Sequence, residues 1–320
     1  MINSKDNNLL ILLGPTGVGK TGISLKLAQK TPDIEIVSAD SVQIYKYMDI
    51  GTAKPAKNIL KAIKHHMIDI VEPSENFNVT QYSKLATEII LDVFKRGNLP
   101  ILTGGSGLYI SSVINPLFIG PARDIEYRET LEEEAKIHGK KYLYEKLSKI
   151  DQVSASKIKP NDFRRIIRAL EVYKSTGKTI SYLQKKASTK NLKFKYHIIG
   201  LKRNRENLYK RINLRIDKMV KDGFIEEVKT LRKMGYKEDL NSMHGLGYKQ
   251  INKHLNGAYS KEEAINLIKI ETRHYAKRQM TWFKNKIENI QWIDLDEYDA
   301  DEVISKIKNK IDNKCRGSIN

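Results

Sequence analysis

The stretch LLILLGPTGVGKTGISLKLA, from Leu9 to Ala28, decides the fold. Its apolar run Leu9–Leu13 predicts a short buried strand, and apolar residues at helical spacing resume after Thr21. The eight residues between these patterns match G-x-x-x-x-G-K-[ST] at every fixed position: Gly14, Pro15, Thr16, Gly17, Val18, Gly19, Lys20 and Thr21. A glycine turn that merely precedes Lys-Thr is the alternative, and the strand and helix patterns on its two sides disfavour it.

A phosphate-binding loop gives this motif a physical purpose. Glycines let consecutive backbone N–H groups point inward, and the helix N-terminus adds a partial positive charge. Lys20 would reach the outer phosphates, and the Thr21 hydroxyl would ligate Mg²⁺. The motif therefore predicts a site for a di- or triphosphate, for which ATP is the default ligand.

The composition describes a soluble globular protein. Its 320 residues are 40% hydrophobic and 30% charged, which allows one large domain or two ordinary ones. Cys315 is the single cysteine, so a disulfide framework and a cysteine-based zinc site are excluded. The sequence shows no apolar run of membrane-span length and no signal peptide in Met1–Asn8, so a cytoplasmic location is expected.

The positive charge is concentrated in the later part of the chain. Lys and Arg exceed Asp and Glu by 19. Residues 1–120 hold 12 bases and 10 acids, whereas the remaining 200 hold 45 bases and 28 acids. This asymmetry favours a polyanionic partner, most often a nucleic acid, over a lysine-rich surface that serves solubility alone.

Short apolar segments alternate with helical patterns in the first 120 residues. Ile34–Ala39, His66–Val71 and Leu99–Leu102 are the further strand candidates, and a helix capped by Thr80 extends to about Phe94. This order predicts an α/β fold, with a mostly parallel sheet covered by helices on both faces. Ligands of such sheets bind beyond the carboxyl ends of the strands, so residues 14–21, 40–43 and 103–107 should meet at one crevice.

The pattern changes after Gly120. Residues 121–194 contain no convincing strand and predict a helical insertion, which divides a P-loop core of residues 1–120 and 195–311. Lys195–Leu201 and Ile290–Ile293 are expected to be strands of that core. Helices are expected over 205–219 and 224–234, and from a capping box at Ser260 to about Asn285. The tail after Ile311 is expected to fray.

Asp40 and Thr103 are the polar residues that follow two of the predicted strands. A carboxylate at position 40 can hold Mg²⁺, accept a proton or cap the next turn. A P-loop ATPase would normally carry an acid after the strand that ends at Leu102, and Thr103 stands there instead. Asp40 is therefore a candidate general base. The glycine-rich loop Thr103–Gly107 is a second candidate oxygen clamp, or simply a tight turn.

Two later segments combine cations with helical spacing. Asn161 is the expected cap of a helix on which Arg164, Arg165 and Arg168 lie close together. These arginines can bind phosphates or pair with acids such as Glu171, and the spacing leaves both open. The run Thr272–Phe283 interleaves cations and aromatic rings, which suits either a nucleic-acid surface or a helix that packs Trp282 and Phe283 into the core.

Together these segments resemble the tRNA dimethylallyltransferase (tRNA isopentenyltransferase) family. They occur in the order and spacing of that family: GPTGVGKT (14–21), DSVQIYKYMDIGTAKP (40–55), HHMIDIVEPSENFNV (65–79), TGGSGLY (103–109), NDFRRIIRALEVY (161–173), RINLRIDKMVKDGFIEEV (211–228) and YAKRQMTWF (275–283). No segment resembles the C-terminal zinc finger of eukaryotic members, which implies a bacterial-type form. HGLGYKQ (244–250) follows the family's pattern only in part, which weakens any RNA contact assigned there.

The resemblance implies an enzyme that moves a dimethylallyl group from its diphosphate to the exocyclic amine of the adenosine just 3′ of the anticodon in tRNA. The P-loop would then hold a diphosphate leaving group rather than a nucleotide. The resemblance implies that Asp40 accepts the amine proton and that Thr103 orients the amine. It also implies that Lys20, Arg215, and Thr21 with Mg²⁺, neutralise the departing diphosphate.

The same resemblance implies an RNA interface. The helical insertion would hold the anticodon stem-loop, and the expected partners are tRNA and dimethylallyl diphosphate, with no membrane and a monomeric chain. The residues expected to contact tRNA are Asp40, Ser41, Val42, Gln43, Thr103, Arg164, Arg165, Arg168, Lys277, Arg278, Gln279 and Trp282. The alternatives are a P-loop kinase or ATPase, an enzyme that prenylates free AMP or ATP, and a non-enzymatic RNA-binding protein.

Overall fold

A computed structural model describes residues 7–115, 118, 120, 121, 123–188, 192 and 194–311. The chain divides into two compact units. One consists of residues 1–114 and 193–320, and the other of residues 115–192. The insertion thus begins a few residues before the expected position 121. The tail expected to fray, together with Cys315, lies outside the described residues.

A six-stranded parallel sheet forms the centre of the larger unit, in the order β3-β2-β4-β1-β5-β6. The strands are β1 (Asn8–Leu13), β2 (Ile34–Ala39), β3 (His65–His66), β4 (Leu99–Gly104), β5 (Lys195–Lys202) and β6 (Gln291–Asp294). Every residue of β1 and β2 is buried, as expected of parallel strands that are covered on both faces. The predicted α/β class is confirmed.

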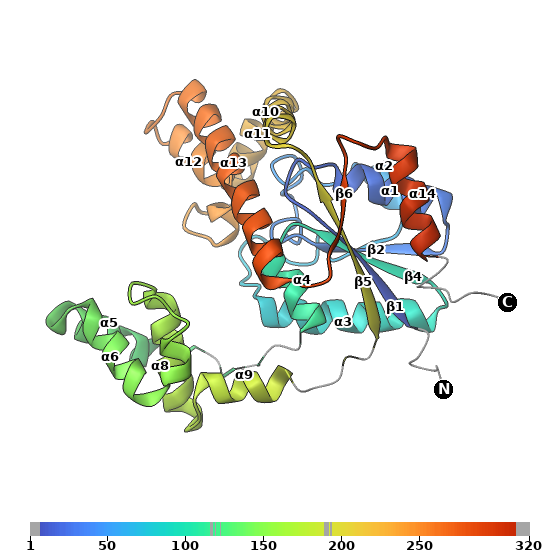
Figure 1. Ribbon diagram of the computed structural model, residues 1–320. Coiled ribbons are helices and arrows are strands. Elements are labelled where there is room, and N and C mark those ends of the chain that lie inside the picture. Colours follow the sequence, from blue (N-terminus) through green and yellow to red (C-terminus); the bar gives the residue numbers. More distant parts are fainter. Residues whose placement is uncertain are drawn as a thin grey trace. The chain divides into compact units, whose positions relative to one another are not determined.

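Helices cover both faces of this sheet (Figure 1). α1 (Lys20–Lys30), α10 (Arg205–Lys221) and α14 (Ala300–Lys310) pack on one face with Leu10, Leu12 and Ile36. α3 (Val79–Lys95), α4 (Gly107–Ile114) and the end of α13 (Lys261–Lys286) pack on the other, with Leu9, Ile11 and Leu13. The alternation of side chains along β1 therefore supplies both cores.

The remaining elements of this unit are α2 (Lys57–Ala62), α11 (Phe224–Lys233), the short 3₁₀ helix Ser242–His244 and α12 (Tyr248–Leu255). The smaller unit is built from α5 (Ile125–His138), α6 (Lys140–Ile150), α7 (Gln152–Ala155), α8 (Phe163–Thr176) and α9 (Ile180–Ser188). It has a hydrophobic core of its own, in which Leu131, Leu143, Leu147, Ile166 and Leu170 are almost fully buried. The helical character expected of residues 121–194 is confirmed for the described residues.

Three local predictions are wrong. The strand expected over His66–Val71 is only His65–His66, because Met67 and Asp69 adopt positive φ and interrupt the extended backbone. The cap of α3 is Asn78 rather than Thr80, since its side chain accepts hydrogen bonds from the N–H groups of residues 80 and 81. The cap of α8 is Asp162 rather than Asn161. Neighbouring polar residues compete for a cap, and sequence spacing does not decide between them.

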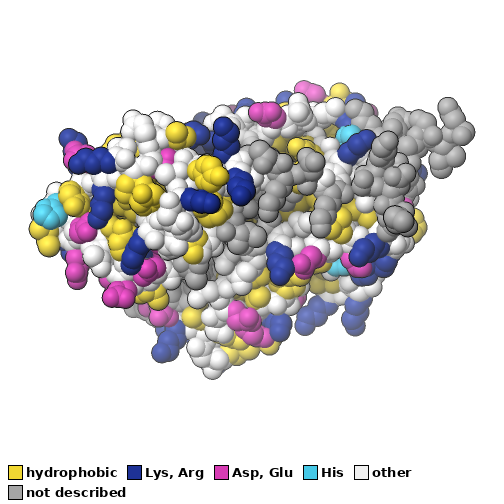
Figure 2. Space-filling view, turned by 90° about the horizontal axis from the view of Figure 1, so that it is seen from below, with side chains coloured by type: hydrophobic (Ala, Val, Ile, Leu, Met, Phe, Trp, Pro, Cys, Tyr) yellow, Lys and Arg dark blue, Asp and Glu magenta, His cyan; other side chains and the backbone are white. Residues whose placement is uncertain are grey.

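Charged side chains are spread over the surface. On the face shown in Figure 2, lysine and arginine alternate with aspartate and glutamate, so the positive excess does not form one continuous block there. No helix in the described part of the chain combines the length and apolar character needed to cross a bilayer.

Candidate active site

The P-loop connects the end of β1 to the start of α1. Gly17 has φ of 81°, and a Cβ there would lie 2.7 Å from the Ile212 side chain on α10, so glycine is required by both conformation and space. Lys20 Nζ donates hydrogen bonds to the backbone oxygens of Gly14 at 2.8 Å and Pro15 at 2.9 Å. The lysine is thereby held inside the turn that its own loop makes.

Burial makes the charge of Lys20 costly. It lowers the pKa of Lys20 to about 7, helped by repulsion from Arg215 and opposed by attraction to Asp40. Burial also lowers the pKa of Arg215, and Asp40 again acts in the opposite direction. Two confined cations with one nearby carboxylate are electrostatically prepared to receive an anion.

Asp40 follows the last residue of β2 and has two roles. Its Oδ1 accepts hydrogen bonds from the backbone N–H groups of Val42 at 2.9 Å and Gln43 at 3.3 Å, which is the capping role considered above. Its Oδ2 accepts none from the described residues. One oxygen therefore fixes the turn, and the other is left for chemistry in the cavity that Asp40 lines.

Thr103 lies beside Ser38 in the register of β2 and β4. Its hydroxyl is buried and has no hydrogen-bond partner among the described residues. An unpaired buried hydroxyl is costly in a folded protein, and each one calls for an explanation. Because Thr103 lines the same cavity as Asp40, its hydroxyl is available to a ligand bound there.

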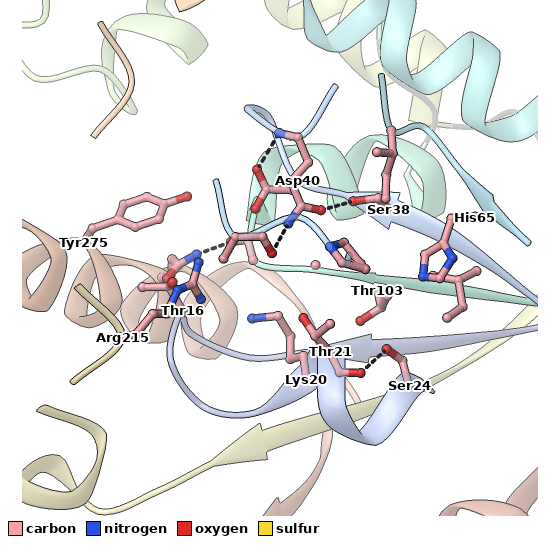
Figure 3. A pocket seen from close by; sticks show the side chains of 18 residues that line it. Thr16, Lys20, Thr21, Ser24, Ser38, Asp40, His65, Thr103, Arg215 and Tyr275 are labelled. Atoms are coloured by element: carbon pink, nitrogen blue, oxygen red, sulfur yellow. Dashed lines mark hydrogen bonds between the residues drawn. The ribbon is translucent and has the colours of Figure 1, made fainter. Parts of the chain in front are cut away.

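The predicted crevice is a polar cavity of about 90 Å³. Lys20 and Thr21 lie on one side of it, with Asp40 opposite and Thr103 between them on β4 (Figure 3). Arg215 and Tyr275 lie toward one end, and His65 lies toward the other. The structure therefore brings together the five residues that the sequence assigns to catalysis and metal binding: Lys20, Thr21, Asp40, Thr103 and Arg215.

A second cavity of about 260 Å³ shares four residues with the first: Thr16, Asp40, Arg215 and Tyr275. Its other lining is largely apolar and includes Val42, Ile216, Met219, Phe224 and Ile268. Asp40 and Arg215 thus stand where a charged compartment meets a hydrophobic one. Such a junction suits a substrate with an anionic part and an apolar part.

The residues of the polar cavity fit a magnesium ion that is shared with a phosphate ligand. Mg²⁺ commonly takes one carboxylate or hydroxyl from the protein and completes its six positions with phosphate oxygens and water. Thr21 and Asp40 offer one oxygen ligand each in the same cavity. No group of three or more His, Cys, Asp or Glu side chains suited to a metal occurs within the described residues.

Gln279, one of the residues expected to contact RNA, makes hydrogen bonds within the protein. It is 6% exposed, and both ends of its amide are used within the protein. Oε1 accepts from the Thr16 backbone N–H at 2.9 Å, and Nε2 donates to the Gly105 oxygen at 2.8 Å. Gln279 therefore joins the P-loop to the glycine-rich loop that follows β4.

Trp282 and Gln43 are also engaged inside the protein. The Trp282 ring packs so closely on Gly107 that a Cβ there would lie 2.2 Å from it, which matches the core-packing alternative for this helix. Gln43 Nε2 donates to the backbone oxygen of Thr52 at 3.1 Å. Lys277 and Arg278 are exposed on α13, and Ser41 and Val42 line the apolar cavity, so these four stay candidates for RNA contact.

The three arginines of α8 are not equivalent. Arg168 donates to the carboxylate of Glu171, whose side chain is fully buried, and to the Pro121 oxygen at 3.0 Å. Burial would raise the pKa of Glu171, but hydrogen bonds from Arg128 and Arg168 outweigh it and hold that pKa at about 2. Arg168 therefore takes the structural alternative that the sequence left open. Arg164 and Arg165 are exposed and can reach a ligand.

Tyr275 is the residue of the site that the sequence-based assignment omits. It lines both cavities, and burial with the nearby Asp40 charge raises its pKa to about 12 despite hydrogen bonds with Ser106 and Gln279. It stands four residues before Gln279 on one helix, so the two share a face. That spacing is the signal that would have indicated it.

Comparisons with known proteins agree with this geometry. A family model described as IPP transferase matches residues 43–286. A tRNA dimethylallyltransferase of Thermoanaerobacter sp. (strain X514) is 48% identical over 301 residues, which cover 93% of this chain and 95% of the relative. Another, from Halothermothrix orenii, is 46% identical over 304 residues, covering 95% and 92%.

Solved structures give the same result. The crystal structure of a tRNA isopentenylpyrophosphate transferase from Bacillus halodurans matches with a TM-score of 0.71 and 43% identity, covering 95% of each chain. A eukaryotic dimethylallyltransferase described as acting on tRNA matches with a TM-score of 0.79 and 28% identity, covering 95% of this chain and 79% of the other.

Proposed function

Because the chain belongs to the tRNA dimethylallyltransferase family, we propose that it transfers a dimethylallyl group to the N6 amine of the adenosine on the 3′ side of the anticodon in tRNA. The donor is dimethylallyl diphosphate, and diphosphate is released. The observation that carries this proposal is the junction of the two cavities at Asp40 and Arg215. The charged cavity suits the diphosphate, and a donor whose apolar part enters the second cavity would have its carbon–oxygen bond near the Asp40 carboxylate.

The leaving group develops negative charge as the carbon–oxygen bond breaks. Lys20, which two backbone oxygens hold, and Arg215 line the polar cavity before the reaction, so they can stabilise that charge with little reorganisation. Mg²⁺ held by the Thr21 hydroxyl, when bound, would neutralise further charge on the phosphate oxygens. A di- or triphosphate bound here does not have to be hydrolysed, which agrees with Thr103 in place of an acid at the end of β4.

The attacking nitrogen is a weak nucleophile, because its lone pair is delocalised into the adenine ring. Asp40 accepts its proton as the new carbon–nitrogen bond forms, through the oxygen that is not used by the turn. The unpaired Thr103 hydroxyl accepts or donates a hydrogen bond that orients the amine. The bond balance is complete: one C–O bond breaks, one C–N bond forms, and the proton moves to the carboxylate.

The acceptor base must leave its stack in the anticodon loop to reach this buried site. Exposed cations on the larger unit, such as Lys277 and Arg278, and on the smaller unit, such as Arg164 and Arg165, are suited to the phosphate backbone. The net positive charge of residues 121–320 supports a polyanionic acceptor over free AMP or ATP. We further propose that the smaller unit contacts the anticodon stem-loop.

Incubation with labelled dimethylallyl diphosphate tests the function directly. Label should enter tRNA in the absence of ATP, and digestion of the product should place it on the adenosine 3′ of the anticodon. Label that enters free AMP instead would identify a different acceptor. ATP hydrolysis with no transfer of label would support the kinase or ATPase alternative.

We expect Arg164→Ala combined with Arg165→Ala to weaken tRNA binding and to lower its dependence on salt. Each phosphate contact that is lost should reduce the slope of log K against log[salt] by about 1. Binding should be measured by filter assay or anisotropy at several salt concentrations. Lys30→Ala, which removes an exposed lysine of α1 paired with Asp301, is the control. An unchanged slope in the double variant would remove both arginines from the interface.

Diphosphate binding should also depend on pH through Lys20. In the free protein the pKa of Lys20 is about 7, so the fraction of protonated lysine falls as pH rises above 7. A bound anion favours the protonated form, and binding must then take up a proton. We expect pyrophosphate affinity to fall from pH 7 to 9, by up to about tenfold per pH unit.

Calorimetry in buffers of different ionisation enthalpy measures this proton uptake. Lys20→Arg is the matched control, because its guanidinium stays charged over the same range. Subtracting the proton uptake of Lys20→Arg from that of the wild type removes the contribution that comes from titration of pyrophosphate itself. Equal proton uptake by the wild type and Lys20→Arg would contradict the prediction.

A further inference from the structure

Residues 45–53 form an irregular segment that walls both cavities. Ala53 lines the polar cavity, and Gly51 and Thr52 line the apolar one. Tyr47 has φ of 63° and Ala53 has φ of 50°, which is the left-handed region that non-glycine residues rarely adopt. Such backbone persists only where surrounding contacts over-determine it, and such sites cluster at functional positions.

One carboxylate from another element holds this segment. Glu227, on α11, accepts hydrogen bonds from three consecutive backbone N–H groups: Asp49 at 2.8 Å, Ile50 at 2.6 Å and Gly51 at 3.1 Å. The Tyr248 hydroxyl donates a fourth hydrogen bond to the same carboxylate at 2.7 Å. Each carboxylate oxygen of Glu227 thus accepts two hydrogen bonds from groups of the protein.

The packing around Gly51 leaves no room for a side chain at this position. A Cβ at position 51 would lie 2.1 Å from the Phe224 ring and 2.7 Å from the Tyr248 ring. Phe224 and Tyr248 are themselves buried and meet edge to face, with ring centroids 5.0 Å apart. Segment 49–51 is therefore fixed by a carboxylate on one side and by two rings on the other.

Hydrogen bonds continue from this segment to Asp40. Gln43 Nε2 donates to the backbone oxygens of Thr52 at 3.1 Å and Ala53 at 3.4 Å, directly after the segment that Glu227 holds. The backbone N–H of Gln43 donates to Asp40 Oδ1 at 3.3 Å. The Ser38 hydroxyl donates to Gln43 Oε1 at 3.2 Å. The Gln43 side chain thus joins the segment to the turn that carries Asp40.

We propose that Glu227 is a positioning residue for the transfer reaction. It fixes segment 49–51, the adjacent carbonyl groups fix Gln43, and Gln43 fixes the direction of the Asp40 carboxylate. The inference rests on the proposed function, because it takes Asp40 as the base. Glu227 lines neither cavity, so it does not touch a ligand bound in them, and these hydrogen bonds are its route to Asp40.

Glu227→Gln tests the proposal with little change in volume. One end of the glutamine amide is a donor, and it would face backbone N–H groups that also donate. We expect kcat to fall by about 10- to 100-fold, since a displacement near 1 Å at the reacting centre costs that much. The KM for dimethylallyl diphosphate should stay within about twofold of the wild-type value, because no hydrogen bond joins the P-loop to residues 49–51 in the described part of the chain.

The matched control is Glu35→Gln. Glu35 is also a buried carboxylate with several donors, namely Arg96, Asn98 and His66, but it lies at the start of β2 rather than at its carboxyl end. Both variants should lose thermal stability. A loss of kcat that is confined to Glu227→Gln would show positioning, whereas similar losses in both would reduce Glu227 to a structural role and overturn the proposal.

Tyr248→Phe provides a second, milder variant, which decides the question if Glu227→Gln does not fold. It removes one of the four donors and keeps the ring against Gly51, so a smaller fall in kcat with unchanged KM is expected. A rise in KM with unchanged kcat in either variant would overturn the proposal. Absence of transfer by the wild type would instead refute the proposed function, so the two failures are distinguishable.

Discussion

Replacing Asp40 with Asn should lower kcat for dimethylallyl transfer by about 10²- to 10³-fold, which corresponds to about 3–4 kcal/mol of barrier. Asparagine keeps an Oδ1 that can accept from the Val42 and Gln43 N–H groups, so the turn after β2 survives. It cannot accept the amine proton. tRNA binding should therefore stay near the wild-type value while the chemical step slows, which single-turnover kinetics with labelled donor would measure.

Asp92→Asn is the control for this substitution, because Asp92 is an exposed acid that pairs with Arg96 on α3. It should be as active as the wild type. Full activity of Asp40→Asn would refute the assignment of Asp40 as base. Loss of tRNA binding in step with kcat would show that Asp40 serves the RNA rather than the proton transfer.

Replacing Lys20 with Met should also lower kcat, by about 10²- to 10³-fold, because one preorganised cation is removed from the leaving group. Methionine keeps most of the side-chain volume but cannot donate to Gly14 and Pro15, so part of the loss will come from a less ordered loop. Transfer should be measured at saturating donor, and pyrophosphate binding should be measured separately by calorimetry.

Lys26→Met separates these effects, since Lys26 is exposed on the same helix α1 and outside both cavities. It should leave kcat and pyrophosphate binding unchanged. If Lys20→Met keeps the wild-type kcat, the P-loop would not be the site of the leaving group, and the proposed orientation of the donor would have to be reversed.

Much of the fold could be predicted because its signals are local. β1, β2, β4 and β5 are short apolar runs, and their order with the intervening helices predicts a parallel sheet. The strand expected over His66–Val71, of which only His65–His66 forms, shows the limit of such signals. HMIDIV contains four apolar residues, but Met67 and Asp69 adopt positive φ. The backbone N–H groups of residues 69–71 bond to the oxygens of residues 43 and 44, and periodicity does not reveal such pairing.

The candidate site was predicted where the topology fixes it. The carboxyl ends of β1, β2 and β4 meet at one edge, so Lys20, Asp40 and Thr103 had to converge. Gln279 and Arg168 show why the rest was not predictable. Helical spacing identifies the face that each occupies, but not whether a loop, a buried acid or solvent lies opposite that face.

Because Gln279 accepts a hydrogen bond from Thr16 N–H, the protection of that backbone amide against hydrogen exchange depends on a helix distant in sequence. Thr16 N–H has its acceptor on α13, 263 residues away in sequence. Any opening that lifts α13 from the core therefore frees this amide to exchange with solvent, even while β1 and α1 stay folded. Deuterium uptake by a peptide that contains Thr16 would consequently report the docking of α13, and tRNA bound to that helix should slow it.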